Sequence, residues 1–419
     1  MPLERPPAFQ FDLSQLLSGF GGIYLVNAIV GFLFAASAPV TIILTASEQG
    51  GLSESDIASW LFGAFFLNGL ISLGFCLAYR QPLVFFWTIP GTVLVGQALT
   101  HLSFPQVIGA YYVTAVLMLV LGLSGWVRKV MSRLPMPIVM AMVAGVFLQF
   151  GLNLIFAIRD GLLIAGPMTA VFLLLSAVPK LGRVMPPLIG ALIVGVLAFT
   201  LLGEFNLRPE STGGLLARPN FYWPEWSWAA MIELVLPLAI TVLAAQNAQG
   251  FVVLESAGHK PPVDAVTTAC AIGSVFAAAV GCVSTCLTGP VNALISSAGD
   301  KDKHYVAGVM VALLALLFGL FSPVFTQFML ATPKAFIAAL AGLALLRVLE
   351  RAFVVSFRGS FTVGAAVTFI VTVANVPILT IGAPFWAILV GCAVSWLLER
   401  DDFRALAGLD RSGPPQPQK

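Results

Sequence analysis

Charged residues are scarce in this chain, and their scarcity excludes a soluble fold. Only 10% of the 419 residues are Asp, Glu, Lys or Arg, whereas a soluble domain carries about 25%. The longest uncharged stretches cover residues 13–47, 81–127, 265–299 and 359–398. A spanning helix needs about 20 apolar residues, so each stretch has room for one span or two. With a mean hydropathy of +0.97, the sequence predicts an all-α integral membrane protein that crosses the bilayer many times.

Cysteine and histidine are also rare, with five and three residues, and they form no pattern that binds a metal or a cofactor. Cys282 and Cys286 are close together, but no histidine or carboxylate beside them completes a site. The sequence lacks the H-E-x-x-H, G-x-S-x-G and P-loop motifs, which argues against an enzyme and against an ATP-driven pump. A net charge of +2 without a basic patch argues against a nucleic-acid partner. We therefore expect no metal, no cofactor and no nucleic acid.

Fourteen apolar segments are predicted. They begin near residues 19, 56, 88, 106, 136, 161, 185, 229, 262, 289, 305, 334, 359 and 380. Segments three and ten are too short for a full crossing. With both termini in the cytoplasm, the positive-inside rule is obeyed by all basic residues except Arg159, Arg208, Arg218 and Lys334. We therefore expect a multi-pass protein of the bacterial cytoplasmic membrane, with the tryptophans of residues 222–228 in a periplasmic loop.

The chain also matches itself at an offset of about 197 residues. The matching pairs are Gly122 with Gly319, Gly145 with Gly342 and Pro187 with Pro384, and Gly91 with Gly289 at an offset of 198. Because seven segments are an odd number, the second copy enters the membrane from the opposite side, which gives a 7+7 inverted repeat typical of secondary transporters. The repeats are predicted over residues 1–203 and 226–400, with a periplasmic linker over 204–225 and a cytoplasmic tail over 401–419.

Segments three and ten share an interruption by proline and glycine. Each has an extended entry, then Pro90-Gly91 or Gly289-Pro290, and then about ten residues that suit a half-helix. Such interruptions at matching places in two halves are the best sequence pointer to a transporter's binding site. Two helix N-termini near the midplane could bind an anion, whereas two kinked packing helices are the alternative. The candidate residues are Thr88, Ile89, Pro90, Gly91, Thr92, Thr288, Gly289, Pro290, Val291 and Asn292.

Segment eight adds three amides within four residues, Gln246, Asn247 and Gln249. Amides are costly in lipid unless they face a partner or a cavity. Gln246 and Gln249 share one helix face, so we predict that they line the same pocket, with amides that join neighbouring helices as the alternative. Ser37, in a predicted break of segment one, is a further candidate for this pocket.

The motif W-T-I-P-G-T at residues 87–92, together with A-Q-N-A-Q-G-F at residues 245–251, resembles the benzoate:proton symporter family, BenE. The resemblance extends to about Arg400 and implies the uracil-permease-type (UraA-like) fold. In that fold segments one to four and eight to eleven form a core domain, and segments five to seven and twelve to fourteen form a gate domain. The implied function is import of benzoate, or a close aromatic carboxylate, with protons by alternating access. Benzoate, a proton and the lipid bilayer are the implied partners, with a homodimer left open.

Two alternatives to this function stay open. One is a transporter of the same fold for another anion or for a nucleobase, and the other is a channel or a membrane enzyme. Nucleobase permeases carry a carboxylate in segment eight where this chain has Gln246, which argues against a nucleobase. Benzoate suits a pocket without negative charge, and Phe85, Phe86 or Trp87 could contact its ring.

The carrier of the coupled proton is the least defined expectation. No carboxylate is predicted at mid-membrane depth, so the proton belongs to a carboxylate near a segment end or to the substrate itself. Glu255, nine residues beyond Gln246, is preferred over Glu233 and Asp264, although pairing of Glu255 with Lys260 is the alternative. The three histidines, His101, His259 and His304, are expected in loops.

Overall fold

The computed structural model describes residues 4–6, 22–36, 38–125, 135–178, 180–181, 185–204, 214–297, 299–376 and 383–409. Within these ranges the chain is mostly helical, with one pair of short strands. The elements of the first half are α2 (Gly22–Ala36), α3 (Ala38–Gln49), α4 (Glu54–Leu61), η1 (Phe62–Leu67), α5 (Asn68–Tyr79), β1 (Phe85–Trp87), α6 (Ile89–Ala98), α7 (Phe104–Ser124), α9 (Met136–Asp160), α10 (Leu162–Ala177) and α12 (Pro187–Leu201).

The second half begins at residue 228 and repeats this order in outline. Its elements are α13 (Trp228–Ala230), η2 (Met231–Val235), α14 (Leu236–Ile240), η3 (Thr241–Asn247), α15 (Ala248–Ser256), α16 (Val263–Ala279), β2 (Thr285–Leu287), α17 (Gly289–Ile295), η4 (Lys301–Lys303), α18 (His304–Leu320), α19 (Ser322–Leu330), α20 (Lys334–Phe357), α21 (Thr362–Ala374), α22 (Ala383–Leu398) and α23 (Arg400–Leu409). Helices α9 and α20 begin at the residues where segments five and twelve were predicted to begin.

The helices have the length and the surface of a multi-pass membrane protein. Among the described residues, six helical stretches are long and apolar enough to cross a bilayer, and six further apolar helices have 10–17 residues. Their outward side chains are large and apolar, as at Leu163, Leu197 and Ile370, each more than half exposed. Water would not tolerate an apolar surface of this extent, whereas lipid does. Trp223, Trp226 and Trp228 are also exposed, as expected for an aromatic belt.

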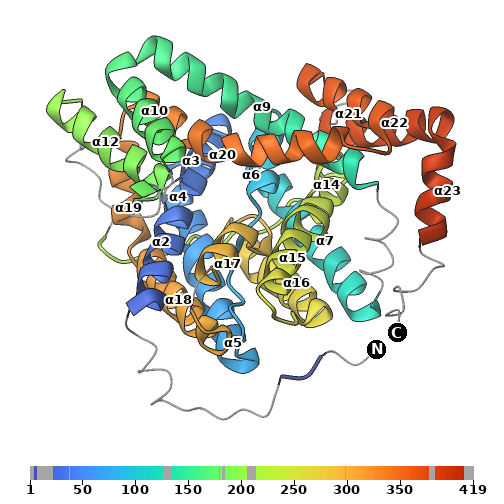
Figure 1. The fold of residues 1–419 in the computed structure, drawn as a ribbon, viewed down its shortest axis with the longest axis horizontal. Coiled ribbons are helices and arrows are strands. Elements are labelled where there is room, and N and C mark those ends of the chain that lie inside the picture. Colours follow the sequence, from blue (N-terminus) through green and yellow to red (C-terminus); the bar gives the residue numbers. More distant parts are fainter. Residues whose placement is uncertain are drawn as a thin grey trace.

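The helices pack in two groups. Helices α9, α10, α12, α20, α21 and α22 contact one another and lie along the upper side of Figure 1. Below them, α2, α5, α7, α16, α17 and α18 pack around the two strands. Helices α3 and α6 and the segment η3 join the two groups, because α3 contacts α20 while α6 and η3 contact α9. Of the residues predicted to bind substrate, those on α6 and η3 are therefore carried by elements at this boundary.

The two strands join the first half of the chain to the second. β1 and β2 are antiparallel, with Phe85 opposite Leu287 and Trp87 opposite Thr285. Thr88 and Thr288 cap the helices that follow, so the true offset at the strands is 200 residues. The predicted match of Gly91 with Gly289 is therefore wrong by two residues, and the counterpart of Gly289 is Ile89. Strand hydrogen bonds fix this register, whereas matches of glycine between helices tolerate a shift.

In the described part of the chain, three helices contain π-helical turns, which the sequence did not predict. They are η1, η2 and η3, each continuous with α-helix on at least one side. A π turn holds an extra residue, which rotates the side chains after it, and such turns are frequent at functional sites. Two of the three carry predicted residues, because Glu233 lies in η2 while Gln246 and Asn247 lie in η3.

Candidate functional site

The strand pair holds the starts of α6 and α17 in related positions. The Thr88 N–H donates to Ser284 O (3.0 Å), and the Thr288 N–H donates to Val84 O (3.1 Å). Each capping threonine is followed two residues later by proline, which fits the first helical turn because that turn's N–H has no partner within the helix. The interruption predicted at both segments is thus a strand, a capping threonine and a short helix.

The first turn of α6 satisfies its own polar groups. Thr88 Oγ1 accepts from the Gly91 N–H (3.2 Å) and donates to Thr241 Oγ1 (3.2 Å), while Thr92 Oγ1 donates to Thr88 O (2.9 Å). Both threonine side chains are fully buried. They therefore stabilise the helix start, and their hydroxyl groups are already engaged by the protein.

The start of β1 is held by a side chain from α17. Asn292 Oδ1 accepts from the Val84 N–H (3.0 Å), and Asn292 Nδ2 donates to Val84 O (3.2 Å). The Asn292 side chain is fully buried. Predicted as a binding residue, Asn292 instead uses its amide to tie the two strand–helix units together.

Asn247 has a similar structural task at β2. Its Oδ1 accepts from the Leu287 N–H (2.8 Å), and its Nδ2 lies 3.6 Å from Cys270 Sγ on α16. The side chain is 1% exposed, so it too is occupied by the protein. The alternative of an amide that joins neighbouring elements therefore applies to Asn247.

Gln246 and Gln249 differ from Asn247, because neither forms a hydrogen bond with the described part of the chain. Gln246 is 7% exposed, and its segment η3 packs against β2, α6 and α9. Gln249 lies over the start of α17, since a Cβ atom on Gly289 would lie 2.6 Å from Gln249 Cγ. Gln249 is partly exposed, and the amide atoms of neither residue are among the buried polar atoms that lack a partner, so both amides are free to bind a ligand.

The aromatic residues beside the motif are packed within the protein. Phe85 contacts Phe75, with ring centroids 5.1 Å apart. Phe86 and Trp87 both contact Phe65, at 5.4 and 5.1 Å. The three rings of residues 85–87 are at most 4% exposed. They form the wall behind the strands, and their faces are largely covered by other rings.

The stretches of sequence that carry the two free amides and the two strand–helix units contain no charged residue. Residues 234–254, 81–99 and 265–299 contain neither Asp, Glu, Lys nor Arg. The predicted contribution of two helix N-termini is smaller than expected, because α6 is capped by Thr88 and α17 has only seven residues. The arrangement offers neutral amide donors in an apolar setting, which suits a small apolar molecule with one anionic group. Ser37, also predicted here, lies outside the described residues.

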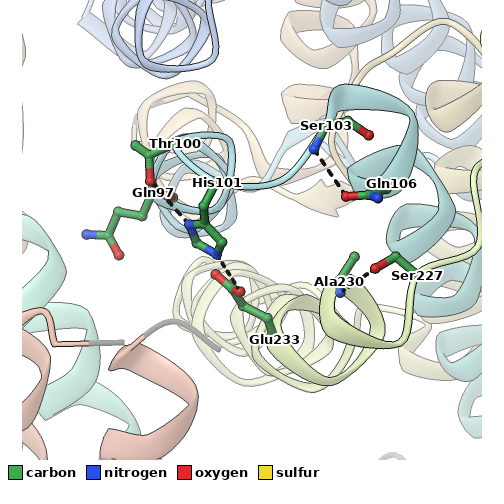
Figure 2. Close-up of polar contacts among 8 residues, drawn as sticks. All are labelled: Gln97, Thr100, His101, Ser103, Gln106, Ser227, Ala230 and Glu233. Atoms are coloured by element: carbon green, nitrogen blue, oxygen red, sulfur yellow. Dashed lines mark hydrogen bonds and ion pairs between the residues drawn. The ribbon is translucent and has the colours of Figure 1, made fainter. Parts of the chain in front are cut away.

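The three predicted proton carriers lie in different surroundings. Glu255 is exposed near the end of α15, and no ion pair links it to Lys260 in the described structure. Asp264 is buried in the first turn of α16, where the Glu4 carboxylate accepts from its N–H (3.2 Å). Glu233 is 6% exposed, and its Oε2 lies 2.9 Å from His101 Nε2. Figure 2 shows this contact between η2 and the loop after α6.

His101 and Glu233 border a cleft of about 320 Å³ between the two helix groups. Its neutral polar side chains come from α3, α6, α9 and the end of α21, namely Gln49, Gln97, Gln149 and Asn375. The sequence did not single out His101, because its partner is 132 residues away in the chain. The signal available in the sequence was a histidine beside an uncharged helix. That histidine was predicted in a loop, where it lies, but its partner was not predicted.

Solved structures share the fold of this chain. The transmembrane domain of a cyanobacterium bicarbonate transporter, BicA, superposes with a TM-score of 0.58 at 13% identity, over 93% of this chain and 100% of that one. The murine Slc26a9 anion transporter in the inward-facing state gives 0.59 at 16% identity, over 95% of this chain and 73% of that one. The chain has the fold of these transporters.

The family follows from sequence. The model of the benzoate membrane transport protein family, BenE, matches residues 20–397, and the chain belongs to this family. It is 29% identical over 396 residues to the benzoate membrane transport protein of Acinetobacter baylyi, covering 93% of this chain and 96% of that protein. It is 28% identical over 388 residues to the inner membrane protein YdcO of Escherichia coli K12, covering 91% and 95%. The chain is thus a membrane transporter and not an enzyme, and the resemblance found in the sequence is confirmed.

Proposed function

We propose that this protein imports benzoate, or a close aromatic carboxylate, together with protons by alternating access. The Acinetobacter relative carries the name of a benzoate membrane transport protein. The observation that carries the proposal is the pair of free amides, Gln246 on η3 and Gln249 over the start of α17. Amide donors can bind a carboxylate, and the surrounding apolar residues can bind a ring.

The absence of charge around these amides fits a monoanion. A fixed glutamate 4 Å from the substrate carboxylate would cost about 4 kcal/mol at an effective dielectric constant of 20. Residues 234–254, which carry both amides, contain no such group. A site of this kind selects against substrates that need a carboxylate acceptor, including nucleobases.

The proposed transport cycle uses the two helix groups. We assign α2–α7 and η2–α19 to the core and α9–α12 and α20–α22 to the gate, as fourteen membrane segments in a 7+7 inverted repeat. Strand pairing between the halves and the shared Thr-x-Pro at residues 88–90 and 288–290 support the repeat. The distribution of basic residues supports cytoplasmic termini, so the loop that carries His101 faces the periplasm.

Binding measurements on purified variants test the site. Gln246→Ala and Gln249→Ala should each weaken benzoate binding by about 1–3 kcal/mol, because the carboxylate loses one amide donor. Gln327→Ala, an amide of α19 away from the boundary, is the matched control and should bind like the wild type. Unchanged affinity in both site variants, with normal folding, would move the site elsewhere.

Uptake into proteoliposomes tests the substrate and the coupling. Benzoate, sulfate, bicarbonate and uracil are each supplied with and without an inward proton gradient, and protein-free vesicles correct for benzoic acid that crosses lipid unaided. We expect benzoate alone to accumulate, and only with the gradient. Benzoate accumulation that ignores the gradient would contradict symport, and stronger uptake of another solute would favour the same-fold alternative.

A further inference from the structure

The contact between His101 and Glu233 requires a proton, as the hydrogen bonds around the imidazole show. Thr100 Oγ1 has one hydrogen, which it donates to Gln97 O at 2.7 Å. Its oxygen therefore accepts from His101 Nδ1, 3.2 Å away, and Nδ1 carries a hydrogen. Figure 2 shows the ring held between Thr100 and Glu233.

This tautomer fixes what lies between His101 and Glu233. A neutral imidazole with its hydrogen on Nδ1 has only a lone pair on Nε2. A lone pair would repel an ionised carboxylate at 2.9 Å, so one proton must lie between Nε2 and Glu233 Oε2. With that proton the pair has no net charge, and without it the pair carries one negative charge.

We propose that His101 and Glu233 together bind the proton that crosses the membrane with the substrate. The inference rests on the proposed function and names the proton site for it. The proton comes from water in the cleft, is held between Nε2 and the carboxylate, and returns to water on the other side. No covalent bond other than its own N–H or O–H forms or breaks.

Burial of the pair couples proton binding to closure of the cleft. Glu233 is 6% exposed, while His101 is 36% exposed at the cleft. Closing the cleft removes the water that solvates the pair, and dehydrating a net charge costs several kcal/mol. The neutral, protonated pair can be enclosed, whereas the deprotonated pair resists closure.

The pair and the substrate amides belong to the same elements. Glu233 and Gln246 lie on one continuous helical stretch, Trp228–Glu255. His101 follows α6, whose first residue follows Thr88 at the strand pair. If these elements move as one body against α9 and α21, proton and substrate move together.

Glu225, Glu48 and Arg159 at this end have partners of their own. Glu225 accepts from Ser103 Oγ (3.2 Å) and Gln106 Nε2 (3.4 Å). Glu48 of α3 pairs with Lys334, and Arg159 pairs with Asp160 at the end of α9. The elements packed on η2, namely α6, α7, α13 and α14, contain no charged residue, and the tyrosines of α7 are neutral phenols. The net charge at this place therefore comes from His101 and Glu233 themselves.

The two remaining histidines are arranged differently. His259 Nε2 lies 3.1 Å from His304 Nδ1, and both rings are buried. Burial, together with His304 and Lys301 nearby, lowers the pKa of His259 to about 4. The contact between two imidazoles disfavours an added proton, whereas the contact between an imidazole and a carboxylate binds one.

Reconstituted protein tests the assignment by comparing exchange with accumulation. Radiolabelled benzoate exchange across equal pH needs no net proton movement, whereas a gradient of about one pH unit supports about tenfold accumulation with one proton per substrate. Glu233→Gln and His101→Gln should keep exchange and lose accumulation. Their exchange rates should also lose the wild-type decline as pH rises. Glu225→Gln, a neighbouring glutamate with neutral partners, should accumulate benzoate like the wild type.

The outcomes separate the two proposals. If wild-type protein fails to accumulate benzoate, the proposed function fails. If the wild type accumulates and Glu233→Gln does so equally, the proton site is overturned while the function stands. Should Glu233→Gln fail to fold, His101→Gln decides alone, because this half-exposed ring tolerates replacement: retained accumulation overturns the assignment, and loss of accumulation with intact exchange supports it.

Discussion

The two strand–helix units, β1–α6 and β2–α17, share a backbone plan but are stabilised differently. In both, a capping threonine donates its N–H to a carbonyl of the opposite unit, and proline follows two residues later. In the first unit Thr88 caps its own helix. In the second unit Thr288 makes no such bond, and Asn247 of η3 holds β2 instead.

This difference separates structural amides from available ones. The second unit depends on a side chain from η3, so the amide-rich stretch at residues 246–249 both supports β2 and faces the start of α17. Asn247 does the first and Gln249 the second. Two neighbouring positions on one helix thus have different roles: Asn247 supports β2, and Gln249 is available to bind the substrate.

The largest effect is expected at Asn292. Asn292→Ala leaves the buried Val84 N–H without a partner, and should destabilise the protein by about 3 kcal/mol. At the counterpart position, Thr92→Ala removes only the hydroxyl bond to Thr88 O. Thr88 O still accepts from the Thr92 N–H, so this substitution should cost about 1 kcal/mol of stability or less. Unfolding in mixed micelles, followed by tryptophan fluorescence, measures both. Equal losses would show that Asn292 is no more important than Thr92 for holding the two units together.

A smaller effect is expected from adding one carbon at Gly289. In Gly289→Ala the new Cβ would lie 2.6 Å from Gln249 Cγ, so the flexible glutamine must move away. Benzoate affinity should fall about tenfold, a loss of about 1.4 kcal/mol, with little change in stability. Isothermal titration measures the affinity.

A double variant identifies the cause of this loss. If Gly289→Ala acts through Gln249, adding Gln249→Ala should cause no further decrease. Gly74→Ala, which has open space around its new Cβ, controls for the substitution itself. Additive losses would mean that Gly289 contributes to binding independently of Gln249.

The smallest effect distinguishes the two capping threonines. Thr88→Val removes an N-cap bond and should cost about 1 kcal/mol of stability. Thr288→Val removes a hydroxyl that caps nothing, and should cost less than half as much. The same unfolding assay compares them, and a larger loss at Thr288 would reverse the proposed division between the units.

The sequence predicted the interruptions of segments three and ten but not the strand pair found there. Pro90 and Pro290 marked both helix starts, because proline restricts the backbone in a way that survives any tertiary context. The extended entries were predicted, but their pairing as strands was not, since three residues are too few for alternation and the partners lie 200 residues apart. The π turns escaped as well, because no residue pattern specifies them.

Side-chain roles were harder to predict than positions. Gln246, Asn247 and Asn292 look alike in sequence, since an amide can bond to backbone or face a cavity. Only the fold shows that Asn247 and Asn292 face the strands. His101 lies in a loop as predicted, but its pairing with Glu233 was not predicted, because the two are distant in the chain and such a pair leaves no local signal.

The strand pair also constrains how the protein is made. When β1 has been synthesised, its partner β2 is still about 200 residues away, which at about 5–20 residues per second means a delay of about 10–40 s. During this delay the N–H and C=O groups of β1 lack the partners that lipid cannot supply, at several kcal/mol for each group. The first half can therefore insert but cannot finish folding, and it must be kept from aggregating until the second half arrives. Membrane insertion and native packing are separate events in this chain, and the last strand synthesised completes the first.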